Sequence, residues 1–322
     1  MRLRLVPQET NIDFFKFARV TFGASVVAMV LSLGIWFAMG LNFGIDFLGG
    51  TTIRTESAQS VDVGTYRSAL EALDLGDVTI TEVFDPTFGP DENVAMIRIQ
   101  AQAGEEAVTP ETIVQVEDAL RALDPAMEFP SVESVGPKVS GELIQTAVLA
   151  VVASLGAILV YIWLRFEWQF SVGAVAALIH DIVLTIGLFS LLQIRFDLAT
   201  IAALLTIVGY SINDTVVIFD RLRENLIKFK QRDLRDVMNL SANETLSRTL
   251  MTSGTTLVAL LALLVLGGDV IRGFVFAIFW GVIVGTYSSI YVAKNVVLMI
   301  GVKRDWSKPD AKAGTQFSNI DA

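Results

Sequence analysis

Residues 198–219 read LATIAALLTIVGYSINDTVVIF, an unbroken apolar stretch in which Asp214 is the only charged side chain. At a rise of about 1.5 Å per residue, a helix of this length crosses the roughly 30 Å hydrocarbon core of a bilayer. A charged side chain in that core costs about 3 kcal/mol on insertion scales, so it usually faces a partner or a water-filled path. The stretch therefore predicts a membrane-spanning helix that carries a functional carboxylate.

Five more apolar runs of similar length lie on either side of this stretch. The whole chain is 53% hydrophobic and only 18% charged, with a mean hydropathy of +0.58, which is too apolar for an ordinary soluble fold. We therefore expect an α-helical membrane protein with six transmembrane helices, one before and five after a long polar segment. The six runs are 20–39, 143–164, 170–192, 198–219, 246–266 and 274–298.

The Lys and Arg residues divide unequally between the two sides of this predicted membrane domain. Of the 24 basic residues, 17 fall in the alternate segments that include both termini, and 7 fall on the other side, although that side holds the longest loop. The positive-inside rule then places both termini on the cytoplasmic side of the membrane. The predicted divisions are a cytoplasmic tail (1–19), a first span (20–40), a periplasmic domain (41–141), a five-helix membrane domain (142–300, with a cytoplasmic loop at about 220–245) and a cytoplasmic tail (301–322).

The long outer segment has the pattern of a small α+β domain. Strand-like runs at 51–55, 78–84, 94–100 and 128–135 alternate with helical periodicity at 61–73 and 110–123. Thr109 and Pro110 have the residue types of an N-cap and a first helical position. The order βαββαβ is that of a ferredoxin-like domain. We find no catalytic constellation in it and expect a scaffold or binding module, so the protein is not expected to be an enzyme.

Cysteine is absent and the chain has one histidine. Disulfides are therefore impossible, and a zinc site built from His and Cys is not expected. We expect no metal and no cofactor. After Val302 the chain is polar and is expected to be a dispensable tail.

Asp214 is the strongest candidate for chemistry. In the hydrocarbon it is suited to reversible protonation, and Ser211, Asn213 and Thr215 add polar groups that could bond to it or hold water. The alternative is a structural hydrogen bond between helices, made by Asn213 or Asp214.

Arg248, at the start of the fifth apolar run, is the candidate counter-charge. Arginine keeps its proton at physiological pH, so its pairing with Asp214 would depend on whether the aspartate is protonated. The alternative is an interfacial arginine that extends to lipid headgroups.

Two other features of the spans are candidates for function or packing. His180 and Asp181, in the middle of the third run, could relay a proton, although adjacent residues on a helix point about 100° apart and a packing role is equally open. Gly281 and Gly285 form a G-x-x-x-G pattern, which allows a close helix contact, either within the bundle or with another chain.

Several motifs, in order along the chain, resemble the SecF family, a branch of the SecD/SecF group that is similar to RND exporters. The resemblance covers residues from about 10 to 300. The matching stretches are NFGIDFLGGT (42–51), VGPKVSGEL (135–143), RFEW (165–168), ALIHD (177–181), the segment 211–224 with NDT (213–215) and FDR (219–221), and the segment 245–256.

This resemblance implies a fold, partners and site residues. It implies a six-helix half of an RND-like bundle that SecD completes. It also implies that the pair works with the SecYEG channel, with YajC as a further candidate partner, and uses the proton motive force for preprotein export. The family's coupling aspartate falls on Asp214 and its arginine on Arg248. Alternatives are a passive assembly scaffold, half of an RND-type small-molecule exporter, and an intramembrane hydrolase. For the hydrolase, both an Asp214 and Asp181 dyad and a serine site of Ser253 with His180 lack the usual sequence context.

Overall fold

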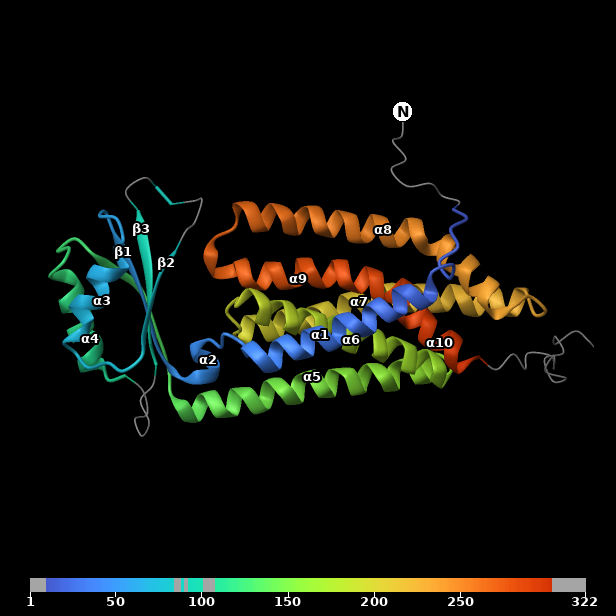
Figure 1. The fold of residues 1–322 in the computed structure, drawn as a ribbon, viewed down its shortest axis with the longest axis horizontal. Coiled ribbons are helices and arrows are strands. Elements are labelled where there is room, and N and C mark those ends of the chain that lie inside the picture. Colours follow the sequence, from blue (N-terminus) through green and yellow to red (C-terminus); the bar gives the residue numbers. More distant parts are fainter. Residues whose placement is uncertain (1–9, 84–87, 90–91, 101–107, 303–322) are drawn as a thin grey trace, which may run out of the picture.

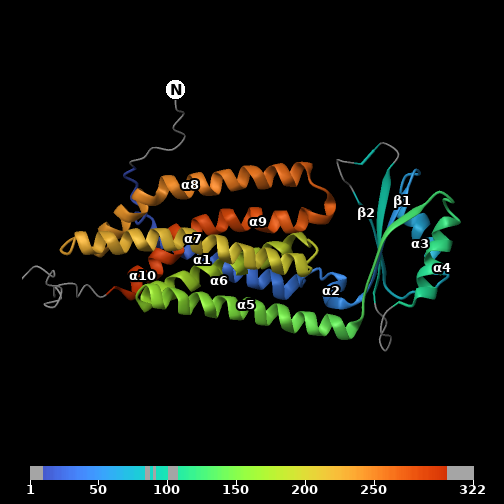
Figure 2. The same ribbon diagram turned by 180° about the vertical axis from the view of Figure 1, so that it is seen from behind.

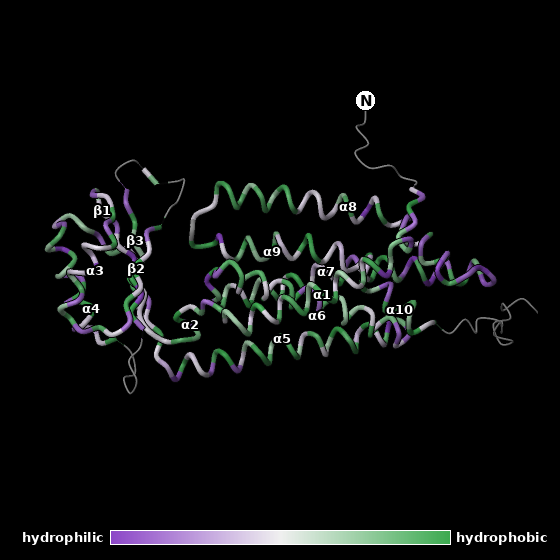
Figure 3. The backbone as a smooth tube through the Cα atoms, in the orientation of Figure 1, coloured by the Kyte–Doolittle hydropathy of each residue, from purple (hydrophilic) through white to green (hydrophobic). Residues whose placement is uncertain are grey.

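The structure is a computed structural model, which describes residues 10–83, 88–89, 92–100 and 108–302. A small α+β domain lies at one end of a long helical bundle (Figure 1). Most of the apolar residues lie in the bundle, whereas the domain is mixed (Figure 3). Among the described residues, six helices are long and apolar enough to cross a membrane, which confirms the predicted fold class.

The bundle helices follow the predicted apolar runs and extend beyond several of them. They are α1 (Ala18–Met39), α5 (Pro137–Arg165), α6 (Trp168–Leu192), α7 (Leu198–Lys228), α8 (Leu234–Leu266) and a last span made of α9 (Asp269–Ser288), a π-helical turn (Ser289–Ala293) and α10 (Lys294–Ile300).

Helix α6 is central, because it packs against α1, α5, α7 and α9. Helices α5 and α8 form opposite edges of the bundle in both views (Figures 1 and 2). Most of the segment expected as a loop at 220–245 is helical, and only 229–233 connects α7 to α8. The helices continue because the polar residues there pair with each other: Arg221 Nε donates to Glu244 at 2.7 Å, and Asn225 donates to the same carboxylate at 2.6 Å.

The outer domain is a four-stranded antiparallel sheet with the order β2-β3-β1-β4, the ferredoxin-like arrangement expected from the βαββαβ pattern. Ile53 of β1 and Ile97 of β3 face each other in the register and are fully buried, with Leu120 of α4 packed against them. Thr109 caps α4 as predicted, accepting from Thr112 N at 3.3 Å. The elements are β1 (Gly50–Ser57), α3 (Val63–Glu71), β2 (Val78–Val83), β3 (Asn93–Gln100), α4 (Pro110–Arg121) and β4 (Glu128–Val135).

The domain joins the bundle through a short helix, α2 (Ile45–Leu48), that ends at two glycines. Gly49 has φ 74° and ψ 166°, a region that only glycine adopts readily, and Gly50 has φ 124°. On the bundle side, Leu198 N, at the start of α7, donates to Asp46 Oδ2 at 3.0 Å. The short helix that leads into the first strand is therefore tied to the start of α7.

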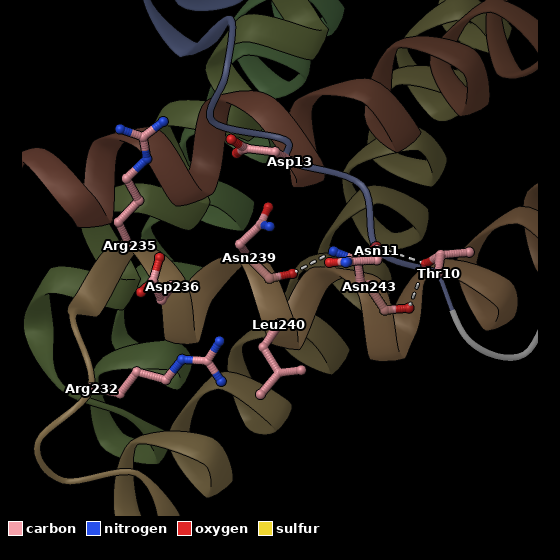
Figure 4. Close-up of a pocket in the computed structure, with 9 residues that line it drawn as sticks. All are labelled: Thr10, Asn11, Asp13, Arg232, Arg235, Asp236, Asn239, Leu240 and Asn243. Carbon is pink, nitrogen blue, oxygen red and sulfur yellow. Dashed lines mark hydrogen bonds between the residues drawn. The ribbon is translucent and has the colours of Figure 1, made fainter.

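The segment before α1 folds against the start of α8 (Figure 4). The Asn243 side chain accepts from Thr10 Oγ1 at 2.7 Å and from Ile12 N at 2.8 Å. Arg235 donates to Phe15 O at 2.9 Å, and Phe15 itself is buried. The predicted tail 1–19 is thus partly an ordered strap from Thr10 onward, while residues 1–9 and the tail after Val302 lie outside the described residues.

Candidate functional site

Asp214 lies on the buried face of α7. Ile207, Ser211, Asp214 and Ile218 recur at helical spacing, and all four are buried, with Asp214 only 3% exposed. Helical periodicity therefore directs this carboxylate into the protein and away from lipid.

The neighbours of the Asp214 carboxylate come from α8. The Arg248 guanidinium is close enough to act on it electrostatically, and the Ser253 hydroxyl lies beside it. Within the described part of the chain, Asp214 and Arg248 form no ion pair at or below 4.0 Å, and Asp214 Oδ2 has no hydrogen-bond partner. Arg248 itself is exposed. The two predicted coupling residues are thus neighbours on adjacent helices but are not paired in this state.

Asp181 is the centre of a separate buried cluster. Its Oδ2 accepts from Ser211 Oγ of α7 at 2.7 Å and from Ser288 Oγ of α9 at 2.9 Å. Its Oδ1 lies 3.0 Å from His180 Nδ1, so the two adjacent side chains do meet. One carboxylate therefore fastens α6, α7 and α9 together.

His180 links this cluster to α1. Its ring stacks on Tyr287 of α9 at 6.1 Å between centroids. The Tyr287 hydroxyl donates to Thr21 O at 2.9 Å and accepts from Ser25 Oγ at 3.1 Å. His180 Nε2 is buried without a hydrogen-bond partner among the described residues. Four of the spanning helices thus meet around His180 and Asp181.

The other polar residues predicted near Asp214 differ in their burial and in their hydrogen-bond partners. Thr215 Oγ1 and Ser289 Oγ lie 2.8 Å apart, at the π-helical turn that interrupts the last span. π-Helical turns are rare and are frequent at functional sites. Asn213 points outward and is exposed. Neither Ser211, Asn213 nor Thr215 bonds directly to Asp214 in the described structure.

The G-x-x-x-G pattern packs within the bundle. A Cβ on Gly281 would overlap the side chain of Ile207, and a Cβ on Gly285 would lie 3.0 Å from Ser211 Cβ and 3.5 Å from Asp181 Oδ2. These glycines let α9 approach α7 closely enough for Ser288 to reach Asp181.

Sequence reasoning did not assign several members of this site to their carboxylates. Ser253 was considered only for a hydrolase, and Ser288 and Tyr287 were not linked to Asp181 and His180, although polar faces on these apolar helices were visible in the sequence. Lys294 was also missed: it is fully buried in the last span, 4.6 Å from the Phe14 ring centroid and 5.2 Å from that of Phe15. No group of three or more His, Cys, Asp or Glu side chains that could hold a metal occurs among the described residues.

Two family models match the chain. Residues 115–303 match the C-terminal region of the SecD/SecF protein export membrane proteins, and residues 34–61, which include Gly49 and Gly50, match the SecD/SecF GG motif.

Relatives match along the whole length. The protein translocase subunit SecF of Cereibacter sphaeroides is 68% identical over 100% of this chain and 99% of its own, and that of Rhodobacter capsulatus is 62% identical over 96% and 95%. The crystal structure of SecDF from Thermus thermophilus, a translocon-associated membrane protein, aligns with a TM-score of 0.81 and 39% identity, covering 93% of this chain. The chain spans about 40% of the length of that SecDF protein. The chain therefore belongs to the SecD/SecF family of protein export membrane proteins, in its SecF branch.

Proposed function

We propose that this protein is the SecF subunit of a Sec translocase in a bacterial inner membrane, that it pairs with SecD, and that Asp214 couples proton movement to preprotein export. Full-length similarity to SecF subunits supports the role in export. The excess of basic residues in the segments containing both termini supports a cytoplasmic location for the two ends. The proposed activity is mechanical, and SecYEG and YajC are its further proposed partners.

An exposed polar stripe on α7 supports the pairing with SecD. Thr206, Gly209 and Asn213 follow each other at helical spacing on the exposed side of this spanning helix. A Cβ on Gly209 would meet nothing within 4 Å, so there is room for another helix. A polar amide such as Asn213 is costly against lipid tails, and a partner helix would satisfy it. The part of SecDF that this chain does not cover is large enough for such a partner.

The observation that carries the coupling proposal is the buried Asp214 carboxylate beside Arg248, with one oxygen unbonded among the described residues. Arginine stays charged, so it attracts Asp214 only while the carboxylate is ionised. Proton uptake and release at Asp214 would therefore switch the attraction between α7 and α8 off and on. Each proton crossing 100 mV supplies about 2.3 kcal/mol, which is enough to shift a two-state equilibrium by roughly fifty-fold.

The connection at the other end of α7 supports a path to the outer domain. Leu198 N bonds to Asp46, three residues before Gly49, and Gly50 is the first residue of β1. A shift of α7 would therefore pull on the junction at which the domain can pivot.

The test is Asp214→Asn, which keeps the side-chain shape and removes titration. The matched control is Asp220→Asn on the same helix, whose carboxylate pairs with Arg165 at the surface. Each variant is co-expressed with SecD, its membrane level and SecD association are measured, and preprotein release from vesicles is followed with and without a proton gradient.

We expect Asp214→Asn to abolish the gradient-stimulated part of release while SecD association persists, and Asp220→Asn to retain it. Unchanged release in Asp214→Asn would instead support a passive scaffold for SecD and the channel.

A further inference from the structure

An open groove lies at the end of the bundle that carries the N-terminal strap. It has a volume of about 810 Å³ and runs between the start of α1 and the end of α10, with the first turn of α8 at one side. It is separate from Asp214 and from the His180–Asp181 cluster, and the proposed coupling makes no use of it.

Three cations surround the mouth of this groove. Lys16 lies two residues before α1, Arg19 lies in the first turn of α1 and Arg235 in the first turn of α8. All three line the groove and are exposed. None forms an ion pair at or below 4.0 Å with the described residues, and Arg235 uses one of its five donors on Phe15 O. No acidic side chain lines the groove among the residues that the structure describes. Asp13 and Asp236 lie beside Arg235 in a neighbouring pocket, but neither lines this groove. The mouth therefore offers three cations that are not in ion pairs with the described residues.

The wall of the groove behind these cations is apolar. Val20 and Phe22 of α1 face Leu298 and Met299 of α10 across it, and Val20 is 67% and Met299 74% exposed. Both helices belong to candidate membrane spans, so apolar side chains that are this exposed are expected to contact lipid tails. Cations at the level where the span begins and apolar side chains further along it match the two parts of a phospholipid.

We propose that this groove binds one anionic phospholipid, with its phosphate between Lys16, Arg19 and Arg235 and an acyl chain along the wall formed by α1 and α10. Basic pockets between spanning helices are suited to such headgroups. The proposed orientation of the protein decides only which leaflet of the membrane supplies this lipid, and that leaflet is then the cytoplasmic one. It does not depend on proton coupling.

Binding is measured by native mass spectrometry of the full chain purified with SecD, titrated with phosphatidylglycerol or with phosphatidylcholine. Two variants probe the two parts of the groove. Lys16→Gln with Arg19→Gln removes charge at the mouth. Gly23→Phe adds an aromatic ring to the apolar wall, at a position where an added Cβ would meet nothing within 4 Å.

The matched control is Arg223→Gln with Lys228→Gln. It removes two cations near the C-terminal end of α7, and neither of them lines the groove. We expect phosphatidylglycerol to bind more tightly than phosphatidylcholine. A basic residue near an anionic lipid contributes roughly a five-fold affinity, so the Lys16 and Arg19 double variant should lose at least about ten-fold. Gly23→Phe should lose binding as well, and the control should keep it.

Several results would overturn the proposal. Equal loss in the control would mean diffuse surface attraction, and unchanged binding in Gly23→Phe would mean that no acyl chain enters the groove. Competition by inorganic phosphate would point to a free-anion site. A photoreactive phenylalanine analogue at position 17, where Phe17 lines the groove and is 60% exposed, should cross-link to lipid, whereas cross-linking to SecD would show that a protein helix occupies it.

Discussion

Replacing Gly281 by Ala tests the close contact on which the Asp181 cluster depends. The new Cβ would overlap the Ile207 side chain, with Cγ2 at 2.8 Å. Isoleucine is branched at Cβ and holds essentially one χ1 rotamer in a helix, so Ile207 cannot turn away. Overpacking of this kind costs about 1–3 kcal/mol, and the better helix propensity of Ala returns up to about 1 kcal/mol. We expect a net loss of stability on the order of 1–2 kcal/mol.

The assay is unfolding of the full chain from mixed micelles by increasing SDS, followed by far-UV circular dichroism. Gly209→Ala is the control, because it adds the same methyl group to the facing helix α7 where nothing lies within 4 Å. It should leave the stability of the isolated subunit unchanged or slightly raised.

The double variant Gly281→Ala with Ile207→Ala separates overlap from other effects. Ile207→Ala alone leaves a cavity and should cost about 2–5 kcal/mol, and in the double variant the methyl group added at position 281 fills part of that cavity. We therefore expect the two losses to be less than additive by at least about 1 kcal/mol. Strictly additive losses, or an equal loss in Gly209→Ala, would refute the idea that Gly281 is required by Ile207.

Two further predictions concern the outer domain and the N-terminal strap. The Ser57 hydroxyl, at 2.5 Å, and the Ala126 N–H, at 3.0 Å, hold the pKa of Asp124 below its usual value. Because the folded pKa is the lower one, this stabilisation is present above about pH 4 and is lost as the pH falls through the folded value. Ser57→Ala should thus lower the thermal midpoint of the domain at pH 7, with a difference from wild type that shrinks below about pH 4; a difference that does not change with pH would contradict this. Asn243→Ala should speed hydrogen exchange at Ile12, whose N–H loses its acceptor, and unchanged exchange there would mean that the strap is held by other contacts.

The fold could be predicted from the sequence because its dominant forces leave a one-dimensional pattern. Apolar runs of bilayer length gave the six helices, and alternation with turn residues gave the four strands in their order. The extension of α7 and α8 through 220–245 could not be predicted in this way, since it depends on Arg221 and Asn225 meeting Glu244 across two helices.

Site residues could be predicted from the sequence where they are ionisable groups in an apolar run. They could not be predicted where their role depends on partners far away in the sequence. Asp214, Asp181 and His180 stand out in apolar runs because such groups are expensive there. The role of Ser288 depends on the close packing of α9 against α7 at Gly285, and the distance between two helices cannot be read from the sequence. The burial of Lys294 against Phe14 and Phe15 likewise requires the N-terminal strap to fold back over the end of the bundle.

The glycine pair at the junction of α2 and β1 also limits how this gene can vary. Any single-base change in a glycine codon that alters the residue yields serine, arginine, cysteine, tryptophan, aspartate, glutamate, alanine, valine or a stop. Every one of those residues carries a Cβ, and none adopts the φ 74°, ψ 166° conformation of Gly49 without strain of about 1–3 kcal/mol. No single-base substitution of this codon that changes the residue is therefore expected to be neutral unless the backbone conformation of the junction changes as well. Related genes should keep Gly49 even where the surrounding domain diverges in sequence.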